Sequence, residues 1–302
     1  LVSVVWPEAG ALIGWSPYWH AGWPELQFYP PGFFFLGWLL WMGSLQQLSL
    51  FTIYQTLIFA TFVVPAINFY LLLVWGAKDR LAELAVAWLA MIFPFPLGGV
   101  QSVFIGIVGY QLAFGFTPLL ILSGFWLFQT EHKPLAWLIS GLILGGIILL
   151  HPYQALFPVG VLAFCAIFIG RGWQGHCFWL VLVLLLALGL TAFWWLPLGV
   201  RRQFFIPVIE GGMLEIRTHL ENEFTWLTGT AWLLAAALIG SFFPRSARRA
   251  LVLAILLGGV SLFTFILFDY LVLVEQLNIT VLDPVRLIPG ITFSLLVGLA
   301  IG

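Results

Sequence analysis

The sequence predicts an all-α fold, a polytopic bundle of transmembrane helices. Two long stretches contain no Asp, Glu, Lys, Arg or His: the 52 residues from Leu26 to Ala77 and the 47 residues from Leu84 to Thr130. The whole chain is 62% hydrophobic and 8% charged, with a mean hydropathy of +1.09. Soluble domains are about one quarter charged. The lipid bilayer is therefore the expected main solvent of this chain.

Division of the sequence at its charges and turn residues gives nine candidate spans. A spanning helix needs about 20 mostly apolar residues. The nine segments are 50–75, 81–98, 113–129, 135–150, 154–170, 177–198, 224–243, 250–269 and 287–302. The apolar segment 32–43 is too short to span, so we expect it to be a helix in the membrane interface, with Trp38 and Trp41 at headgroup level.

The basic residues predict the orientation of the spans, because cytoplasmic loops carry an excess of Lys and Arg. With nine spans, seven basic residues fall on one side: Lys78, Arg80, Lys133, Arg171, Arg245, Arg248 and Arg249. Four fall on the other: Arg201, Arg202, Arg217 and Arg286. We therefore expect a multi-pass protein of the inner (plasma) membrane, with the larger loops 1–31, 199–223 and 270–286 on the non-cytoplasmic side.

The chain reads as a single transmembrane domain over residues 1–302. It begins at Leu1 without Met and stops at Gly302 inside an apolar run, so we expect a piece of a longer protein or a processed chain. A formal net charge of -1 offers no basic surface, and nucleic acid is not an expected partner. Cys165 and Cys177 are too few for a disulfide framework and are expected to be small apolar packing residues.

The most distinctive string is the aromatic and proline-rich stretch from Trp15 to Gly32, WSPYWHAGWPELQFYPPG. An interfacial aromatic belt explains most of its rings, and Pro30 with Pro31 sets an extended entry into the next helix. Neither reason explains His20 and Glu25.

This stretch resembles the first outer loop of the multi-span membrane glycosyltransferases of the GT-C type. The closest likeness is to the membrane family described as related to 6-pyruvoyl-tetrahydropterin synthase. The strings that carry the resemblance are Trp15-Ser-Pro, Gly22-Trp-Pro, Tyr29-Pro-Pro-Gly, His151-Pro, Ala192-Phe-Trp-Trp-Leu-Pro and Pro284-Val-Arg. The layout of the whole chain is also similar.

The resemblance implies transfer of a sugar from a polyprenyl-phosphate donor to an acceptor of the cell envelope at the outer membrane face. In such enzymes an acidic residue after the first span serves as base or metal ligand, and a surface helix follows it. Segment 32–43 corresponds to the surface helix. The acid would lie upstream of Leu1, and Glu8, the nearest acid, does not match the motif.

The departing phosphate of such a donor needs cations to hold it, and guanidinium groups bind phosphate in bidentate fashion. The candidates for this phosphate and donor site are Arg201, Arg202 and Arg286 on the outer side. A pair of snorkelling rim residues is the alternative for Arg201 and Arg202. An ion pair with Asp283 that caps the helix is the alternative for Arg286.

Candidate catalytic residues are His20, Glu25 and His151, which share one predicted side of the membrane. His151 ends an apolar run, so its side chain should face the protein interior or an aqueous cavity. A hydrogen-bonded structural histidine is its alternative reading.

Glu215, His219 and Glu223 recur every four residues and would share one helix face. That face suits acceptor hydroxyls or a divalent cation, which is the one cofactor that the sequence suggests. A solvated loop helix is the alternative.

Two other function classes remain open at the level of the sequence. The first is a non-catalytic integral membrane subunit that binds lipid or a membrane-protein partner. The second is a transporter, in which Pro65, Pro94 and Pro96 would break helices near the midplane. Expected partners are membrane lipids and the polyprenyl-phosphate sugar donor.

Overall fold

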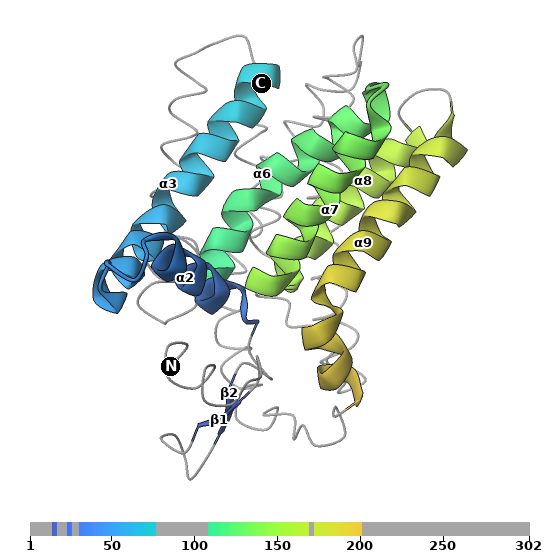
Figure 1. The fold of residues 1–302 in the computed structure, drawn as a ribbon. Helices are drawn as coiled ribbons and strands as arrows, with labels where there is room; N and C mark the ends of the chain where they lie inside the picture. The colour runs from blue at the N-terminus through green and yellow to red at the C-terminus, as the bar shows by residue number, and fades with distance from the viewer. Residues whose placement is uncertain (1–13, 17–22, 26–29, 77–107, 169–171, 201–302) are drawn as a thin grey trace, which may run out of the picture.

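The computed structural model describes residues 14–16, 23–25, 30–76, 108–168 and 172–200. This part of the chain forms six helices and one short pair of strands (Figure 1). The helices are α2 (Gly32–Gly43), α3 (Leu50–Gly76), α6 (Val108–Gln129), α7 (Lys133–Leu150), α8 (Tyr153–Phe168) and α9 (Trp173–Val200). The strands are β1 (Gly14–Ser16) and β2 (Trp23–Glu25).

Four of the described helices are long and apolar enough to cross a membrane, as predicted: α3, α6, α7 and α9. The helix predicted over 154–170 is α8, whose 16 residues span about 24 Å and make it shorter than the other four. Helix α6 begins at Val108 rather than at residue 113, because its first turn buries Tyr110 and Gln111 instead of leaving them in a loop. The predicted spans 81–98, 224–243, 250–269 and 287–302 lie outside the described residues.

The sequence explains several helix ends. Ser49 Oγ accepts a hydrogen bond from the backbone N–H of Thr52 at 3.1 Å and so caps α3. Pro134 lies in the first turn of α7, where a missing N–H costs nothing. Helix α7 ends at Leu150, and its C-cap His151 has an extended backbone (φ −168°, ψ 108°), because the following Pro152 disfavours helical geometry.

Helices α6 to α9 run up and down as consecutive hairpins, and α3 runs in the same direction as α6. Phe33 contacts both α3 and α6 near their first turns: its ring lies 6.3 Å from that of Tyr54, and its Cβ would lie 3.7 Å from a Cβ on Gly109. The bundle thus has two ends. We name them the His151 end, where α7 meets α8, and the Lys133 end, where α6 meets α7.

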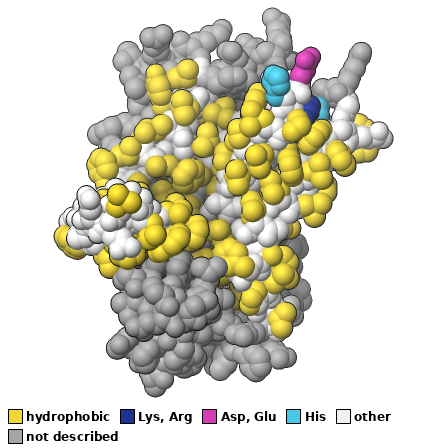
Figure 2. All heavy atoms as spheres, in the orientation of Figure 1, with side chains coloured by type: hydrophobic (Ala, Val, Ile, Leu, Met, Phe, Trp, Pro, Cys, Tyr) yellow, Lys and Arg dark blue, Asp and Glu magenta, His cyan; other side chains and the backbone are white. Residues whose placement is uncertain are grey.

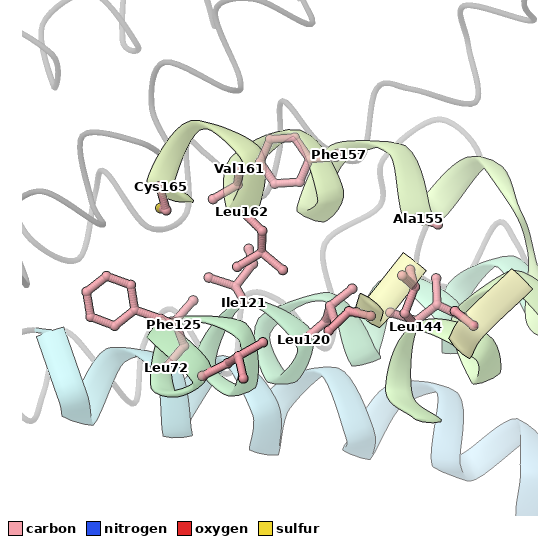
Figure 3. Packing of buried hydrophobic residues seen from close by; sticks show 14 of the residues in the cluster. Leu72, Leu120, Ile121, Phe125, Leu144, Ala155, Phe157, Val161, Leu162 and Cys165 are labelled. Atoms are coloured by element: carbon pink, nitrogen blue, oxygen red, sulfur yellow. The ribbon is translucent and has the colours of Figure 1, made fainter. Parts of the chain in front are cut away.

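The apolar core lies between α3, α6, α7, α8 and α9, and Figure 3 shows part of it. Leu162 of α8 points toward Ile121 of α6, and Cys165 of α8 is fully buried as a free thiol. Glycines permit close approach: a Cβ on Gly124 would lie 2.6 Å from Leu162 Cδ1, and one on Gly115 would lie 2.8 Å from Pro65 Cγ. Small residues at contacts are the usual way in which membrane helices pack.

Helix α2 has the bounds that the sequence predicts, and at about 18 Å it is too short to cross a bilayer. It contacts α3, α6 and α7 at the His151 end (Figure 1). Interfacial helices ordinarily carry a charged face, whereas the only polar side-chain groups of α2 are the indole N–H groups of Trp38 and Trp41. Such a helix suits the depth of an aromatic belt better than the water-exposed surface.

Among the described elements, a short β pair is the one that the sequence did not predict. Strands β1 and β2 are antiparallel, with Trp15 opposite Pro24 and Ser16 opposite Trp23. Pro24 has no N–H, but both strands of a two-stranded pair are edges, where proline is tolerated. The pairing joins the Trp15-Ser-Pro and Gly22-Trp-Pro strings of the N-terminal stretch.

Candidate functional site

The candidate site is the His151 end of the bundle, and His151 is its central side chain. The residue is 5% exposed, so it faces the protein interior as the sequence predicted. Its ring meets the edge of Tyr110 in a T-shaped contact, with centroids 4.7 Å apart and planes at 89°. The ring centroid of Tyr153 lies 5.7 Å from that of His151. Two aromatic rings therefore fix the position of the imidazole.

Two amide side chains are buried in the same part of the bundle. Gln111 follows Tyr110 in the first turn of α6 and is 2% exposed; Gln154 lies in the first turn of α8 and is 4% exposed. The backbone N–H of Gln154 donates to the carbonyl of His151 at 3.1 Å. Polar side chains are costly in a membrane interior and mark functional sites there.

The Tyr29-Pro-Pro-Gly string reaches the same end. Pro30, Pro31 and Gly32 are all buried. A Cβ on Gly32 would lie 2.6 Å from the carbonyl carbon of Leu149. Only glycine allows the backbone to approach this closely, so the N-terminus of α2 is seated against the last turn of α7, next to His151.

The Trp-Trp-Leu-Pro string of α9 also lies at this end. A Cβ on Gly141 of α7 would contact Leu186 of α9, and one on Gly145 would contact Leu190. Residues of α7 and α9 at the same level therefore differ by 45 in number, which means that the two helices run parallel. The same offset puts Trp194 level with Leu149. Trp194 is 4% exposed. Three of the strings that carry the family resemblance thus lie at one end of the described bundle.

Most of the predicted site residues lie outside the described residues. This applies to His20, Arg201, Arg202, Glu215, His219, Glu223 and Arg286, and to Glu8 and Asp283. Glu25 is the last residue of β2, where only the backbone is described, opposite Gly14. Among the candidates, the structure therefore gives a side-chain environment for His151 alone.

Within the described ranges, no three His, Cys, Asp or Glu side chains come together as metal ligands. The divalent cation that Glu215, His219 and Glu223 would bind concerns residues outside these ranges.

Sequence reasoning missed Tyr110, Gln111, Gln154 and Trp194 as members of the site. A usable signal existed for the two glutamines, because each lies next to or within a long apolar run and a carboxamide in such a run should face protein rather than lipid. No comparable signal marked Tyr110 among the 17% of aromatic residues in the chain, and Trp194 was marked only as part of the Ala192-Phe-Trp-Trp-Leu-Pro string.

No family model, curated protein or solved structure matches this chain. The likeness to the GT-C type enzymes stays a prediction from the quoted sequence strings.

Proposed function

We propose that the chain belongs to a membrane glycosyltransferase of the GT-C type. The enzyme transfers a sugar from a polyprenyl-phosphate donor to an acceptor at the non-cytoplasmic face of the plasma membrane. In this proposal the His151 end faces that side, and α2 lies in the interface beside the site.

One observation carries the proposal: the three strings around Gly32, His151 and Trp194 are far apart in sequence but lie at the same end of the bundle. A membrane span alone does not require polar residues at such a meeting point. Burial of Gln154 instead costs free energy that an apolar residue would not incur, because its Nε2 has no hydrogen-bond partner among the described residues. A binding or catalytic role gives a reason for that cost.

The proposed chemistry assigns a role to each group. Transfer requires a base that accepts the proton of the acceptor hydroxyl and a cationic site for the departing phosphate. His151 can accept a proton, and the contacts with Tyr110 and Tyr153 hold its ring in place. Arg201 and Arg202 follow directly after α9 in the sequence and are the proposed phosphate ligands.

The direct test is sugar release from a polyprenyl-phosphate sugar by the purified full-length protein. In the His151→Gln variant we expect release to fall by about 100-fold or more, because a positioned acid or base contributes on that order. Glutamine keeps hydrogen-bonding groups of similar size, so the fold should be retained.

The matched control is His176→Gln. His176 also lies against an aromatic ring, with its centroid 5.0 Å from that of Phe128, but at the Lys133 end. Its substitution should leave sugar release unchanged. Equal losses in both variants, or no release by the unmodified protein with a panel of polyprenyl-phosphate sugars, would contradict the proposal.

A non-catalytic membrane subunit is the second candidate, and the exposed side of α9 favours it. Within the described structure, only 28% of the most apolar 18-residue stretch of this helix is buried. Large apolar side chains are exposed along its length: Phe178, Val181, Leu185, Leu188, Phe193 and Leu196. Lipid or a partner helix can cover such a surface. Stable co-purification with another membrane protein, without sugar release, would favour this candidate.

The transporter alternative gains little from the described helices. Coupled transporters place broken helices or ionisable groups near the membrane midplane. Helix α3 continues through Pro65 without a break, and α6, α8 and α9 likewise continue through Pro118, Pro158 and Pro197. None of the six described helices contains Asp or Glu.

A further inference from the structure

Two buried hydrogen-bond donors at the His151 end have no partner among the described residues. They are Gln154 Nε2 and Trp194 Nε1. Both residues are 4% exposed. Native proteins leave few buried polar groups unsatisfied, so each such group needs an explanation.

The two donors occupy one layer of the bundle. Trp194 is level with Leu149 in the last turn of α7, by the 45-residue offset between α7 and α9. Gln154 is in the first turn of α8, directly after the short α7–α8 connection, and its N–H donates to the carbonyl of His151. Helix α9 contacts both α7 and α8.

The chemistry of the two groups points to the kind of ligand. An indole N–H can only donate, and so can the Nε2 group of a carboxamide. Together they require an acceptor oxygen. In the sequence, Arg201 and Arg202 follow directly after α9. In the proposed function this acceptor oxygen belongs to the phosphoryl group of the sugar donor, because charged acceptors form the stronger hydrogen bonds.

We infer that Gln154 and Trp194 form a pair of neutral donors that binds phosphoryl oxygens of an isoprenyl phosphate. The inference rests on the proposed function for the choice of an isoprenyl chain, and it deepens that function by naming two ligands of the phosphate. Aligned dipoles in a buried site stabilise an oxyanion strongly because they need no reorganisation when charge develops.

The test measures binding of geranylgeranyl monophosphate to the full-length protein in detergent. Inorganic phosphate and geranylgeraniol are the two comparison probes. We expect Gln154→Leu and Trp194→Phe each to weaken binding of geranylgeranyl monophosphate by about tenfold, because each removes one hydrogen bond to a charged group. In the absence of any probe, the variants should melt at the same temperature as the unmodified protein or higher, because an unpaired donor has been removed.

The matched control is Trp137→Phe. Trp137 Nε1 is also buried without a partner among the described residues, but it lies on α7 near the Lys133 end. Its loss should leave binding unchanged. If inorganic phosphate shows the same dependence on Gln154 and Trp194, the phosphoryl group itself is the ligand, which supports the inference with a second source of the same chemistry.

Three results would overturn the inference. Unchanged binding in Gln154→Leu and Trp194→Phe would mean that the donors hold buried water only. Equal weakening in Trp137→Phe would remove the link to the His151 end, and equal binding of geranylgeraniol would remove the role of the phosphoryl group. The test also separates the inference from the proposed function. If binding depends on the two donors but the protein releases no sugar, the inference stands and the proposed function is contradicted. If the protein releases sugar but neither donor affects it, the proposed function stands and the inference is contradicted.

Discussion

Polar side chains are exposed at one end of the described bundle and buried at the other. At the Lys133 end, Glu131 and His132 are exposed in a short turn. Figure 2 shows the charged and histidine side chains of this turn gathered at one corner of an otherwise largely hydrophobic surface, away from α2. At the His151 end, the histidine and two glutamines are buried among helices. Water can solvate the first set, whereas protein or ligand must satisfy the second.

The two ends also differ in how closely backbone approaches backbone at the glycines. At the His151 end, glycines let the α2 and α6 backbones touch the last turn of α7: a Cβ on Gly109 would lie 2.9 Å from the carbonyl oxygen of Leu150. At the Lys133 end, a Cβ on Gly172 or Gly175 would meet nothing within 4 Å. At the His151 end the helix backbones themselves therefore come into close contact, which positions α2 and α6 against the residues next to His151.

The largest effect on this contrast should come from Tyr110→Ala. Tyr110 is 1% exposed and supports the ring of His151, so we expect a loss of about 3–5 kcal/mol in the free energy of unfolding. The matched change on the same helix is Trp126→Ala near the Lys133 end, where the side chain is 38% exposed and the loss should stay below about 1 kcal/mol. Apparent melting temperatures in detergent would measure both; similar shifts would contradict the contrast.

The contact between the N-terminus of α2 and the last turn of α7 can be tested with Gly32→Ala. The new methyl group would overlap the backbone of Leu149, which cannot move aside as a flexible side chain can, and we expect a loss of about 1–3 kcal/mol. Gly37→Ala on the same helix is the control, because its Cβ would lie 3.5 Å from Leu57 in ordinary contact. Helix propensity should make that second variant neutral or slightly more stable. The two variants would be compared by thermal unfolding, and a larger loss of stability in Gly37→Ala would contradict the proposed contact between α2 and α7.

The Lys133 end should respond weakly. Lys133 Nζ donates to the carbonyl oxygen of Leu127 and so satisfies a group in the last turn of α6. Lys133→Met keeps the apolar stem and removes this bond, with an expected loss of about 1 kcal/mol in stability and no change in sugar release. A selective loss of sugar release with unchanged stability would move the candidate site to this end.

The smallest effect concerns the turn between α2 and α3. Leu45 and Gln46 have φ values of 53° and 64°, a region that costs a residue with a side chain about 1 kcal/mol relative to glycine. Gln46→Gly should relieve that strain but increase the entropy of the unfolded chain, so we expect a gain of at most about 0.5 kcal/mol. A fall in melting temperature of several degrees would mean that the glutamine side chain stabilises the turn.

Several elements followed from the sequence for a direct physical reason. Helix α7 needed only an apolar run, Pro134 at its start and the His151-Pro152 pair at its end. The bounds of α2 followed from Pro31 and Gly43 around a short apolar run. The interior position of His151 followed from the cost of exposing an imidazole to lipid. These features depend on local sequence and on the bilayer as solvent, so one sequence is sufficient to predict them.

Only the tertiary structure decided which helix ends meet. Nothing in the spacing of Gly32, Leu149 and Trp194 along the chain states that they share one layer, since interhelical contact depends on the direction and offset of each helix pair. The same holds for the ring contact between Tyr110 and His151 and for the unpartnered donors of Gln154 and Trp194. Hydropathy determines that these segments enter the membrane, whereas side-chain packing determines which polar groups they bury together.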